Sequence, residues 1–272
     1  MRHLGGMMGK VIFLGATGRV GRMVGAAWPA GGPPLDPRAR GQWEEGQAGP
    51  DECVLCLAGV TPRSGAPLED NTRIALAALR MARRRGARHL FVASSSAVLG
   101  DTGTKAASES FGARPAGAYG REKLSMEEAL LADAATDGTS VTVLRIGNVA
   151  GAGEPFDTIG AGGAPRLDRF ADGAGPSRSY IGPVSLARVL SRLCQMALEG
   201  ARLPDRLNVA APGATAMADI FAALGQPPEW RPAPSGAIQR VHMDCSALMA
   251  LCPLPRDAHH ADRLLDEIRA AT

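Results

Sequence analysis

Residues 10–21 read KVIFLGATGRVG: a run of five strand-forming residues, a turn with three glycines, and the start of a helical segment that Pro29 ends. Glycines let a backbone turn tightly and approach a pyrophosphate, whose charge is stabilised by the free amides of the following helix. With 34 glycines in the chain, the spacing alone is weak. Its position between a strand and a helix favours a dinucleotide site over a plain glycine turn. The residues expected to line that site are Gly15, Thr17, Gly18, Arg19, Val20 and Gly21.

Strand and helix patterns alternate outward from this turn. Continuous apolar runs cover residues 53–58, 89–93 and 141–146, and helical spacing covers residues 69–85 and 117–133. Asp70 or Asn71 is expected to cap the first of these helices and Gly86 to end it. Strands that are apolar throughout are typical of a parallel sheet covered on both faces. We therefore predict an α/β fold, a doubly wound parallel sheet of the Rossmann type with a small C-terminal substrate lobe.

The composition changes after residue 150. Residues 151–175 are rich in Gly, Pro and Ala, and so long a loop is often a functional lid. Helices are expected over residues 184–199, 217–224 and 261–271, with a short strand over residues 207–210. We predict that residues 9–150 form an NAD(P)-binding domain. Residues 151–272 then form mostly a smaller substrate-binding lobe, with some segments packing back on the first domain.

Composition narrows the class of protein. The 272 residues are 45% hydrophobic with a mean hydropathy of −0.03, and no apolar run approaches the ~20 residues that cross a bilayer. Residues 1–8 are too short and too weakly apolar for a signal peptide, so we expect a cytoplasmic protein without a membrane partner.

Cysteines and charge point to no metal and no nucleic acid. Cys53 and Cys56 stand three apart in an apparent buried strand and so face opposite sides, which favours core thiols over a shared metal. The five cysteines do not form an obvious disulfide set. The net charge of +3 is small, and the basic run at residues 83–85 ends a helix, where cations complement the helix dipole. Nucleic-acid binding is therefore a minor alternative.

Tyr119-Gly-Arg-Glu-Lys123 is the most specific motif. The chain has two tyrosines and three lysines, so a chance pair at this spacing is rare. On a helix the two side chains share a face, and the Lys123 ammonium, helped by an oxidised nicotinamide, is expected to lower the pKa of the Tyr119 phenol from its usual value near about 10. Tyr119 can then exchange a proton with a substrate hydroxyl while a hydride is transferred. The plain alternative is a surface Tyr/Lys pair.

A serine run follows the strand at residues 89–93. Ser94, Ser95 and Ser96 stand at its carboxyl end, where open α/β sheets bind ligands. A hydroxyl from this run is the expected third member of the site, although such a run can also be ordinary loop chemistry.

These segments in this order resemble the extended short-chain dehydrogenase/reductase family, also called NAD-dependent epimerases/dehydratases. The resemblance rests on GATGRVG (15–21), LAGVTP (57–62), SSSAVLG (94–100), YGREK (119–123), LRIGNVAGAG (144–153) and RSYIGPVSLA (178–187).

The resemblance implies roles for individual residues. Ser95, five residues before Gly100, would be the active serine, with Ser96 as the reserve choice, and Tyr119 and Lys123 would be the catalytic pair. Lys123 would also bind the nicotinamide ribose. The glycines 15, 18 and 21 would hold the pyrophosphate, Leu57, Ala58 and Gly59 would line the cofactor, and Asn148 and Arg178 would meet the substrate.

Three features depart from the family pattern. Leu99 replaces a tyrosine, and Ser185 stands near a position that is usually acidic. Only 29 residues separate Gly21 from Asp51, so a strand and a helix of the adenine-binding half are expected to be trimmed.

The cofactor type is open at this stage. Asp36 can bind the adenosine ribose, whereas Arg19, Arg38 or Arg40 can meet a 2′-phosphate, so the cofactor is NAD or NADP.

The function implied is that of an NAD(P)-dependent oxidoreductase or epimerase that moves a hydride to or from a secondary alcohol or carbonyl. A small-molecule substrate is expected, with a sugar nucleotide as one candidate, and a homodimer is in keeping with the family. Arg178 is expected either to anchor a substrate phosphate or to fasten the lobe through Asp172 or Glu154. The alternative function is a non-catalytic NAD(P)-binding sensor with the same fold.

Overall fold

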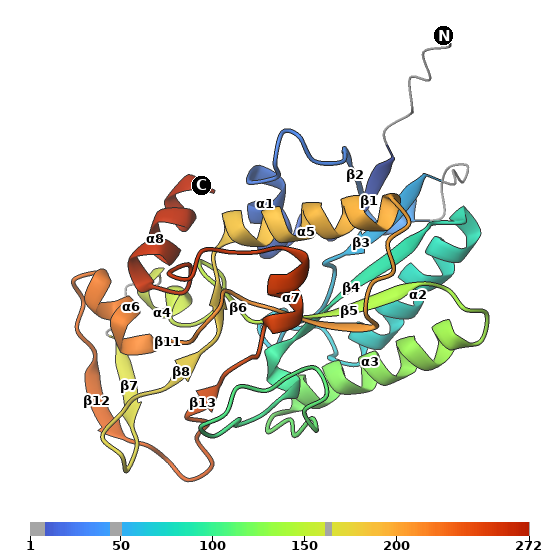
Figure 1. Cartoon of the computed structure of the whole chain (residues 1–272). Coiled ribbons are helices and arrows are strands. Elements are labelled where there is room, and N and C mark those ends of the chain that lie inside the picture. The colour runs from blue at the N-terminus through green and yellow to red at the C-terminus, as the bar shows by residue number, and fades with distance from the viewer. Residues whose placement is uncertain (1–8, 44–50, 161–164, 272) are drawn as a thin grey trace.

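The computed structural model describes residues 9–43, 51–160 and 165–271. The expectation about residues 1–8 lies outside this range, as do parts of the segments 30–50 and 151–175. Figure 1 shows a central sheet with helices on both faces and a lobe to its left.

The central sheet has six parallel strands in the order β10-β5-β4-β3-β1-β2. It is the Rossmann-type sheet that the sequence predicts. Its strands are β1 (Lys10–Leu14), β2 (Leu35–Arg38), β3 (Glu52–Cys56), β4 (His89–Ser95), β5 (Val141–Ile146) and β10 (Arg206–Val209).

Two helices cover each face of the sheet. Helices α1 (Arg19–Ala26) and α5 (Pro183–Leu198) lie on one face, and α2 (Asp70–Arg85) and α3 (Ala118–Ala135) lie on the other (Figure 1). Successive strand residues alternate between the two core clusters, so Cys53 packs with the first layer and Cys56 with the second. The expectation of buried, unpaired core thiols is confirmed for all five cysteines.

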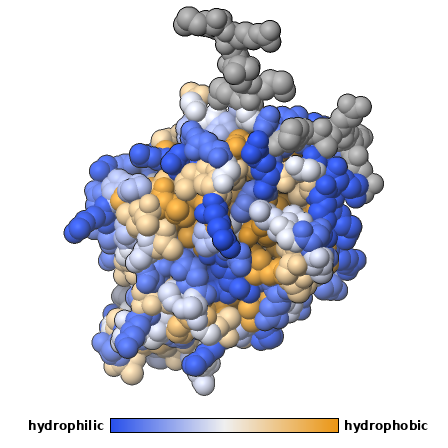
Figure 2. Space-filling view, turned by 45° about the vertical axis from the view of Figure 1, so that its right-hand side comes forward, coloured by the Kyte–Doolittle hydropathy of each residue, from blue (hydrophilic) through white to orange (hydrophobic). Residues whose placement is uncertain are grey.

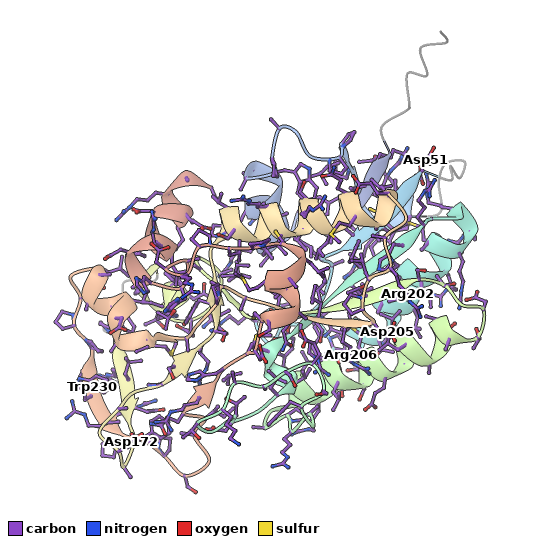
Figure 3. The ribbon with its side chains drawn as sticks, in the orientation of Figure 1. Asp51, Asp172, Arg202, Asp205, Arg206 and Trp230 are labelled. Carbon is purple, nitrogen blue, oxygen red and sulfur yellow. The ribbon has the colours of Figure 1, made fainter. Side chains whose placement is uncertain are left out.

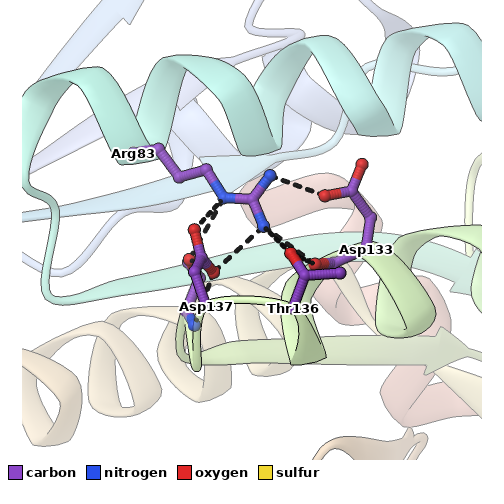
Figure 4. A network of polar contacts seen from close by, with 5 residues as sticks. Arg83, Asp133, Thr136 and Asp137 are labelled. Carbon is purple, nitrogen blue, oxygen red and sulfur yellow. Dashed lines mark hydrogen bonds and ion pairs between the residues drawn. The ribbon is translucent and has the colours of Figure 1, made fainter.

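The basic run at the end of α2 fastens the helix layer. The Arg83 guanidinium donates to the Asp133 carboxylate at 2.6 Å and pairs with Asp137 at 2.7 Å, which ties α2 to the end of α3 (Figure 4). Gly86 ends α2 with a φ of +61°, as expected. The expected capping residue of α2 is wrong. The N-cap position is Glu69, which makes no side-chain cap, and Asp70 and Asn71 lie inside the helix. The Asn71 side chain accepts instead from the Val60 amide.

The adenine half of the sheet is short, in line with the small spacing between Gly21 and Asp51. β2 is the edge strand, and the described residues between β2 and β3 form only a single turn, η1 (Arg40–Gln42). At the other edge, β10 joins β5 and α5 packs beside α1, so these two later segments belong to the sheet layers.

The lobe follows the carboxyl ends of β5 and β10. Residues 151–175 are not structureless, since they include α4 and β7. In Figure 3, Trp230 lies on the outer strand β12, where Arg169 of β7 stacks on its ring at 4.7 Å. The lobe elements are β6 (Asn148–Val149), α4 (Phe156–Gly160), β7 (Arg166–Arg169), β8 (Ser177–Arg178), β9 (Tyr180–Ile181), β11 (Thr215–Ala216), α6 (Met217–Ala223), β12 (Glu229–Pro232), β13 (Arg240–Val241), α7 (Ser246–Leu251) and α8 (Ala261–Ala270).

The surface is mixed. Figure 2 shows hydrophilic residues over most of one face, with apolar side chains gathered near its middle. Among the described residues, no helix combines the length and apolar character needed to span a membrane.

Candidate active site

The glycine-rich turn between β1 and α1 is packed against the segment after β3. Gly15 has a φ of +91°, and a Cβ there would lie 2.4 Å from the Ala58 backbone nitrogen. A Cβ on Gly21 would lie 2.0 Å from the Gly15 carbonyl oxygen. The N-terminus of α1 carries no side-chain cap. This compact turn, whose three glycines carry no side chain, fits a pyrophosphate lying against the helix amides.

Residues 57–60 join this turn to the catalytic motif. The Leu57 amide donates to the Leu14 carbonyl at 2.9 Å and so extends the sheet. A Cβ on Gly59 would lie 3.3 Å from the Lys123 ammonium nitrogen. The buried Asn71 side chain holds both the amide and the carbonyl of Val60 at 3.0 Å. Sequence reasoning missed this role of Asn71 because a polar residue in a first helical turn also fits a cap.

Lys123 is buried beneath the site. Lys123 is the fourth residue after Tyr119 on α3. Its ammonium donates to the Ala93 carbonyl of β4 at 2.9 Å. Only 4% of the residue is exposed, and burial lowers the pKa of Lys123 to about 8. At pH 7 an amine with this pKa still keeps most of its positive charge.

Tyr119 lies half-buried in the first turn of α3, next to Ser95. Burial raises the pKa of the Tyr119 phenol, and a hydrogen bond with Ser95 partly opposes that rise. The lowering of this pKa expected from Lys123 together with an oxidised nicotinamide concerns the complex with cofactor and stays a prediction.

The three serines have different surroundings. Ser94 donates to the Glu127 carboxylate at 2.6 Å, and Ser96 is buried at the start of the single turn η2 (Ser96–Val98). Ser95 accepts a hydrogen bond from the Ala97 amide at 3.2 Å and also bonds to Tyr119. Of the three, Ser95 is the one that the structure brings to the tyrosine.

A buried ion pair lies behind the catalytic motif. Glu127, one turn after Lys123, is fully buried and binds the Arg145 guanidinium of β5, with the shortest contact at 2.8 Å. Arg206 of β10, labelled in Figure 3, reaches the same carboxylate at 3.4 Å. Sequence reasoning did not single out this group, although an acid spaced four residues after Lys123 shares its helix face.

The two predicted substrate residues are held by atoms of the lobe. The Asn148 amide donates to the Ser179 carbonyl at 2.9 Å, and its side chain bonds the Tyr180 hydroxyl. The Arg178 guanidinium donates to three backbone carbonyls: Ser177 and Gln239 at 2.8 Å and Ile238 at 2.9 Å.

Neither carboxylate that was considered as a partner of Arg178 takes that place. Asp172 pairs with Arg240 at 2.5 Å, and Glu154 pairs with Arg63. The positive charge of Arg178 is therefore available to a ligand only if one of its three carbonyl bonds is given up or shared.

The start of the lobe is also tied to the cofactor half. Asp157 of α4, whose side chain is 10% exposed, pairs with Arg19 of the glycine-rich turn and with Arg63 of the loop after β3. Residues 154–157 thus contact the start of α1 and the loop after β3.

The missing acid near Ser185 is replaced from elsewhere in the chain. Glu267 of α8 accepts a hydrogen bond from the Ser185 amide at 2.7 Å and another from its hydroxyl. A carboxylate at the N-terminus of α5 is favourable for the helix dipole. Leu99, the other departure, is fully buried in the core.

At the adenine end, Asp36 and Arg38 project from the same side of β2. One Asp36 carboxylate oxygen accepts from Arg38 at 2.8 Å and from Lys10 at 3.4 Å. Burial disfavours its charge, but these two cations hold the pKa of Asp36 below its usual value.

Comparison with known proteins places the chain in a family. The family model described as "NAD dependent epimerase/dehydratase family" matches residues 34–173. No curated protein matches.

Solved structures match over nearly the whole chain, and their low sequence identity to it supports a shared fold alone. A UDP-glucose-4-epimerase from Stenotrophomonas maltophila, with bound NAD and formylated UDP-arabinopyranose, has a TM-score of 0.74 and 18% identity, covering 97% of this chain and 98% of that one. A UDP-glucose 4-epimerase from Thermus thermophilus, in complex with NAD, has a TM-score of 0.72 and 20% identity, covering 97% and 100%. A UDP-N-acetylglucosamine 4-epimerase from Methanobrevibacter ruminantium, in complex with UDP-N-acetylmuramic acid, has a TM-score of 0.72 and 17% identity, covering 97% and 99%.

Proposed function

The chain belongs to the NAD-dependent epimerase/dehydratase family, and on that premise we propose that it is an NAD(P)-dependent oxidoreductase or epimerase that moves a hydride to or from a secondary alcohol or carbonyl. The observation that carries this proposal is the contact of Ser95 with Tyr119, one helical turn from the buried Lys123. A hydroxyl, a phenol and an ammonium that gather where β3 and β4 end form a unit for moving one proton.

The proposed cofactor site runs along the carboxyl edge of the sheet. Its pyrophosphate would lie on the glycine-rich turn at residues 15–21, and residues 57–59 would line its middle. Lys123, 3.3 Å from the position of a Gly59 Cβ, would hold the nicotinamide ribose. A nicotinamide cofactor supplies the hydride acceptor or donor when bound.

The proton steps fall to the chain's own side chains. In the oxidation direction, we propose that the Tyr119 oxygen takes the proton of the substrate hydroxyl while Ser95 hydrogen-bonds the same substrate oxygen. Because burial raises the pKa of Tyr119, the phenol needs more positive charge than the chain alone provides. We expect it to act as a base once the charge of an oxidised nicotinamide adds to that of Lys123.

Sugar nucleotides are the first substrates to test. The support is that two of the similar structures hold UDP-linked ligands, according to their descriptions. The lobe within residues 151–272, apart from α5 and β10, would bind the substrate, and Asn148 would lie beside it. Arg178 would bind a diphosphate only by exchanging a carbonyl bond, so we expect Arg178→Ala to lower stability as well as substrate affinity.

We further propose a cytoplasmic homodimer that acts on a small molecule. The family resemblance supports the dimer, and light scattering on the purified protein would measure its mass directly.

The test of the function is Tyr119→Phe. The variant removes one hydroxyl, so NAD(P) affinity should stay near that of the parent chain while turnover of a panel of sugar nucleotides and simple secondary alcohols falls by about 10²- to 10⁴-fold. Tyr180→Phe is the matched control, because it makes the same chemical change at the second tyrosine, whose hydroxyl donates to the Glu154 carbonyl at 3.3 Å. Full activity in Tyr119→Phe would refute the mechanism. Cofactor binding with no turnover of any compound by the parent chain would favour the non-catalytic sensor instead.

A further inference from the structure

We propose that the adenosine end of the cofactor site is built to hold a 2′-phosphate, so that the enzyme uses NADP(H) in preference to NAD(H). The inference rests on the proposed function, because it concerns the cofactor of that same site. It follows from three features near the end of β2: an acid that is already neutralised, a pocket beside the turn η1, and an arginine that has no acidic partner among the described residues.

The acid that would select NAD is engaged with the protein. A carboxylate near the end of the second strand normally binds the 2′-hydroxyl of NAD, whereas an arginine there accommodates the 2′-phosphate of NADP. Asp36 lies opposite Ile12, in the middle of β1, and its carboxylate is held by Arg38 and Lys10. The residue at the end of β2 is Arg38 itself, opposite Leu14. A cation therefore stands where the ribose is expected.

A pocket lies between η1 and the first two turns of α2, on the same side of the sheet edge. Its volume is about 280 Å³. The turn η1 follows the carboxyl end of β2, and α2 begins after the loop that leaves β3, so the pocket lies near the edge where the cofactor is expected. Its lining residues are Arg40, Trp43, Asp70, Arg73, Ile74 and Ala77.

The pocket has an apolar wall formed by Trp43 and Ile74. Trp43 is 8% exposed. A purine ring stacks well on an indole. This wall is therefore suited to the adenine.

The rim of the pocket is cationic. Arg40 is exposed, and among the described residues its guanidinium makes no ion pair or hydrogen bond, while its backbone carbonyl accepts from the Trp43 amide at 3.4 Å. Burial raises the pKa of the Cys56 thiol at the end of β3 to about 11, and the charges of Lys123 and Arg40 partly oppose that rise.

Two of the three arginines at this edge are neutralised. Arg38 and Arg73 are paired with Asp36 and Asp70 at 2.8 Å. Among the described residues, Arg40 is the arginine of this group that has no acidic partner. A guanidinium binds phosphate oxygens in pairs, so Arg40 is the residue that would distinguish a 2′-phosphate from a 2′-hydroxyl.

The test is titration calorimetry with two pairs of ligands. NADP⁺ is compared with NAD⁺, and adenosine 2′,5′-bisphosphate with adenosine 5′-monophosphate, which probes the adenosine end without any turnover. The parent chain should bind the 2′-phosphorylated member of each pair at least tenfold more tightly. Arg40→Gln should weaken those two ligands about ten- to hundredfold and leave NAD⁺ affinity nearly unchanged. Arg80→Gln is the matched control, since it removes the same charge from an exposed position of α2 outside the pocket.

A second variant tests the pocket itself. Adenosine 2′,5′-bisphosphate should quench part of the tryptophan fluorescence of the parent chain, and Trp43→Phe should lose that quenching while Trp28 and Trp230 remain. Quenching that persists in Trp43→Phe would overturn the assignment of the pocket.

The outcomes also separate this inference from the proposed function. A chain that turns over substrates with NAD⁺ and binds NAD⁺ as tightly as NADP⁺ would overturn the inference alone, as would an Arg40→Gln variant that keeps the full preference. A chain that binds neither dinucleotide would overturn both.

Discussion

Replacing Glu127 by Gln should destabilise the protein and disturb Lys123 at the same time. Glu127 is fully buried, accepts from Ser94 at 2.6 Å and binds Arg145, whose side chain is only 4% exposed. The amide keeps the size of the carboxylate but removes its charge, so the Arg145 guanidinium stays buried without a counter-ion.

The magnitude follows from that uncompensated charge. Breaking one side of a buried ion pair costs about 3–5 kcal/mol. Arg206 is partly exposed and hydrates without Glu127, so it adds little. For a chain of 272 residues, 1 kcal/mol corresponds to roughly 2 °C in Tm, so Tm should fall by roughly 6–10 °C.

The functional effect has a definite sign. The Glu127 charge favours the ammonium form of Lys123, whose pKa burial lowers to about 8. Without that charge the pKa of Lys123 should fall further, so the ammonium is lost at a lower pH. If the charged form is needed for turnover, the basic limb of the kcat/KM profile moves to lower pH.

The assay combines a thermal melt with a pH profile of kcat/KM. Glu128→Gln is the matched control: it makes the same change at the next residue of α3, which is exposed, and should shift neither readout. A Glu127→Gln protein that melts like the Glu128→Gln control would refute the view that the ion pair is needed to compensate Arg145.

Three other changes have expected outcomes. Gly15→Ala should cost at least about 2 kcal/mol of stability and abolish cofactor binding, because its Cβ has no room at a φ of +91°. The control Gly25→Ala faces open space in α1 and should stabilise the protein by about 0.5–1 kcal/mol. Equal denaturant midpoints for the two variants would contradict this. Lys123→Met should abolish activity yet stabilise the fold at pH 7 by up to roughly 3 kcal/mol, since the folded chain holds the pKa at about 8 against 10.5 when exposed. That gain should persist below pH 8 and vanish as pH rises towards 10.5. Between these values the folded parent has lost the proton that the unfolded parent still holds, so raising the pH stabilises the parent and closes the difference. Melts across this range that show no pH dependence would argue against it. Glu267→Gln should lower stability by about 1–2 kcal/mol through the loss of its charged contact with Ser185 at the start of α5, as measured by urea unfolding, and an unchanged midpoint would rule out the replacement of the missing acid.

Much of the fold was predictable because its signals are local. An apolar run, a glycine turn and a helical pattern each lie within a short stretch, and their alternation implies parallel strands with helices on both faces. The Rossmann-type sheet and the end of α2 at Gly86 both followed from such patterns. Asn71 did not, because a polar residue in a first helical turn has two local explanations, and only the packing of α2 against the loop after β3 decides between them.

The candidate site divides along the same line. Tyr119 and Lys123 are four residues apart on one helix, so their common face is fixed by helix geometry and needs no tertiary information. The tertiary structure alone decided that Ser95 bonds Tyr119, that burial raises the pKa of that phenol, and that Arg178 is held by three carbonyls.

By itself, the sequence determined the order of strands and helices, the glycine turn and the Tyr/Lys pair, because each depends on backbone periodicity or on the steric freedom of a few adjacent residues. Only the tertiary structure decided that Glu267 takes over the acid missing at Ser185, that Asp157 reaches Arg19, and that Arg40 and Trp43 border a pocket beside α2. These contacts join residues far apart in the chain. Which residues meet is decided by how the elements pack against one another, and no pattern within a single segment predicts it.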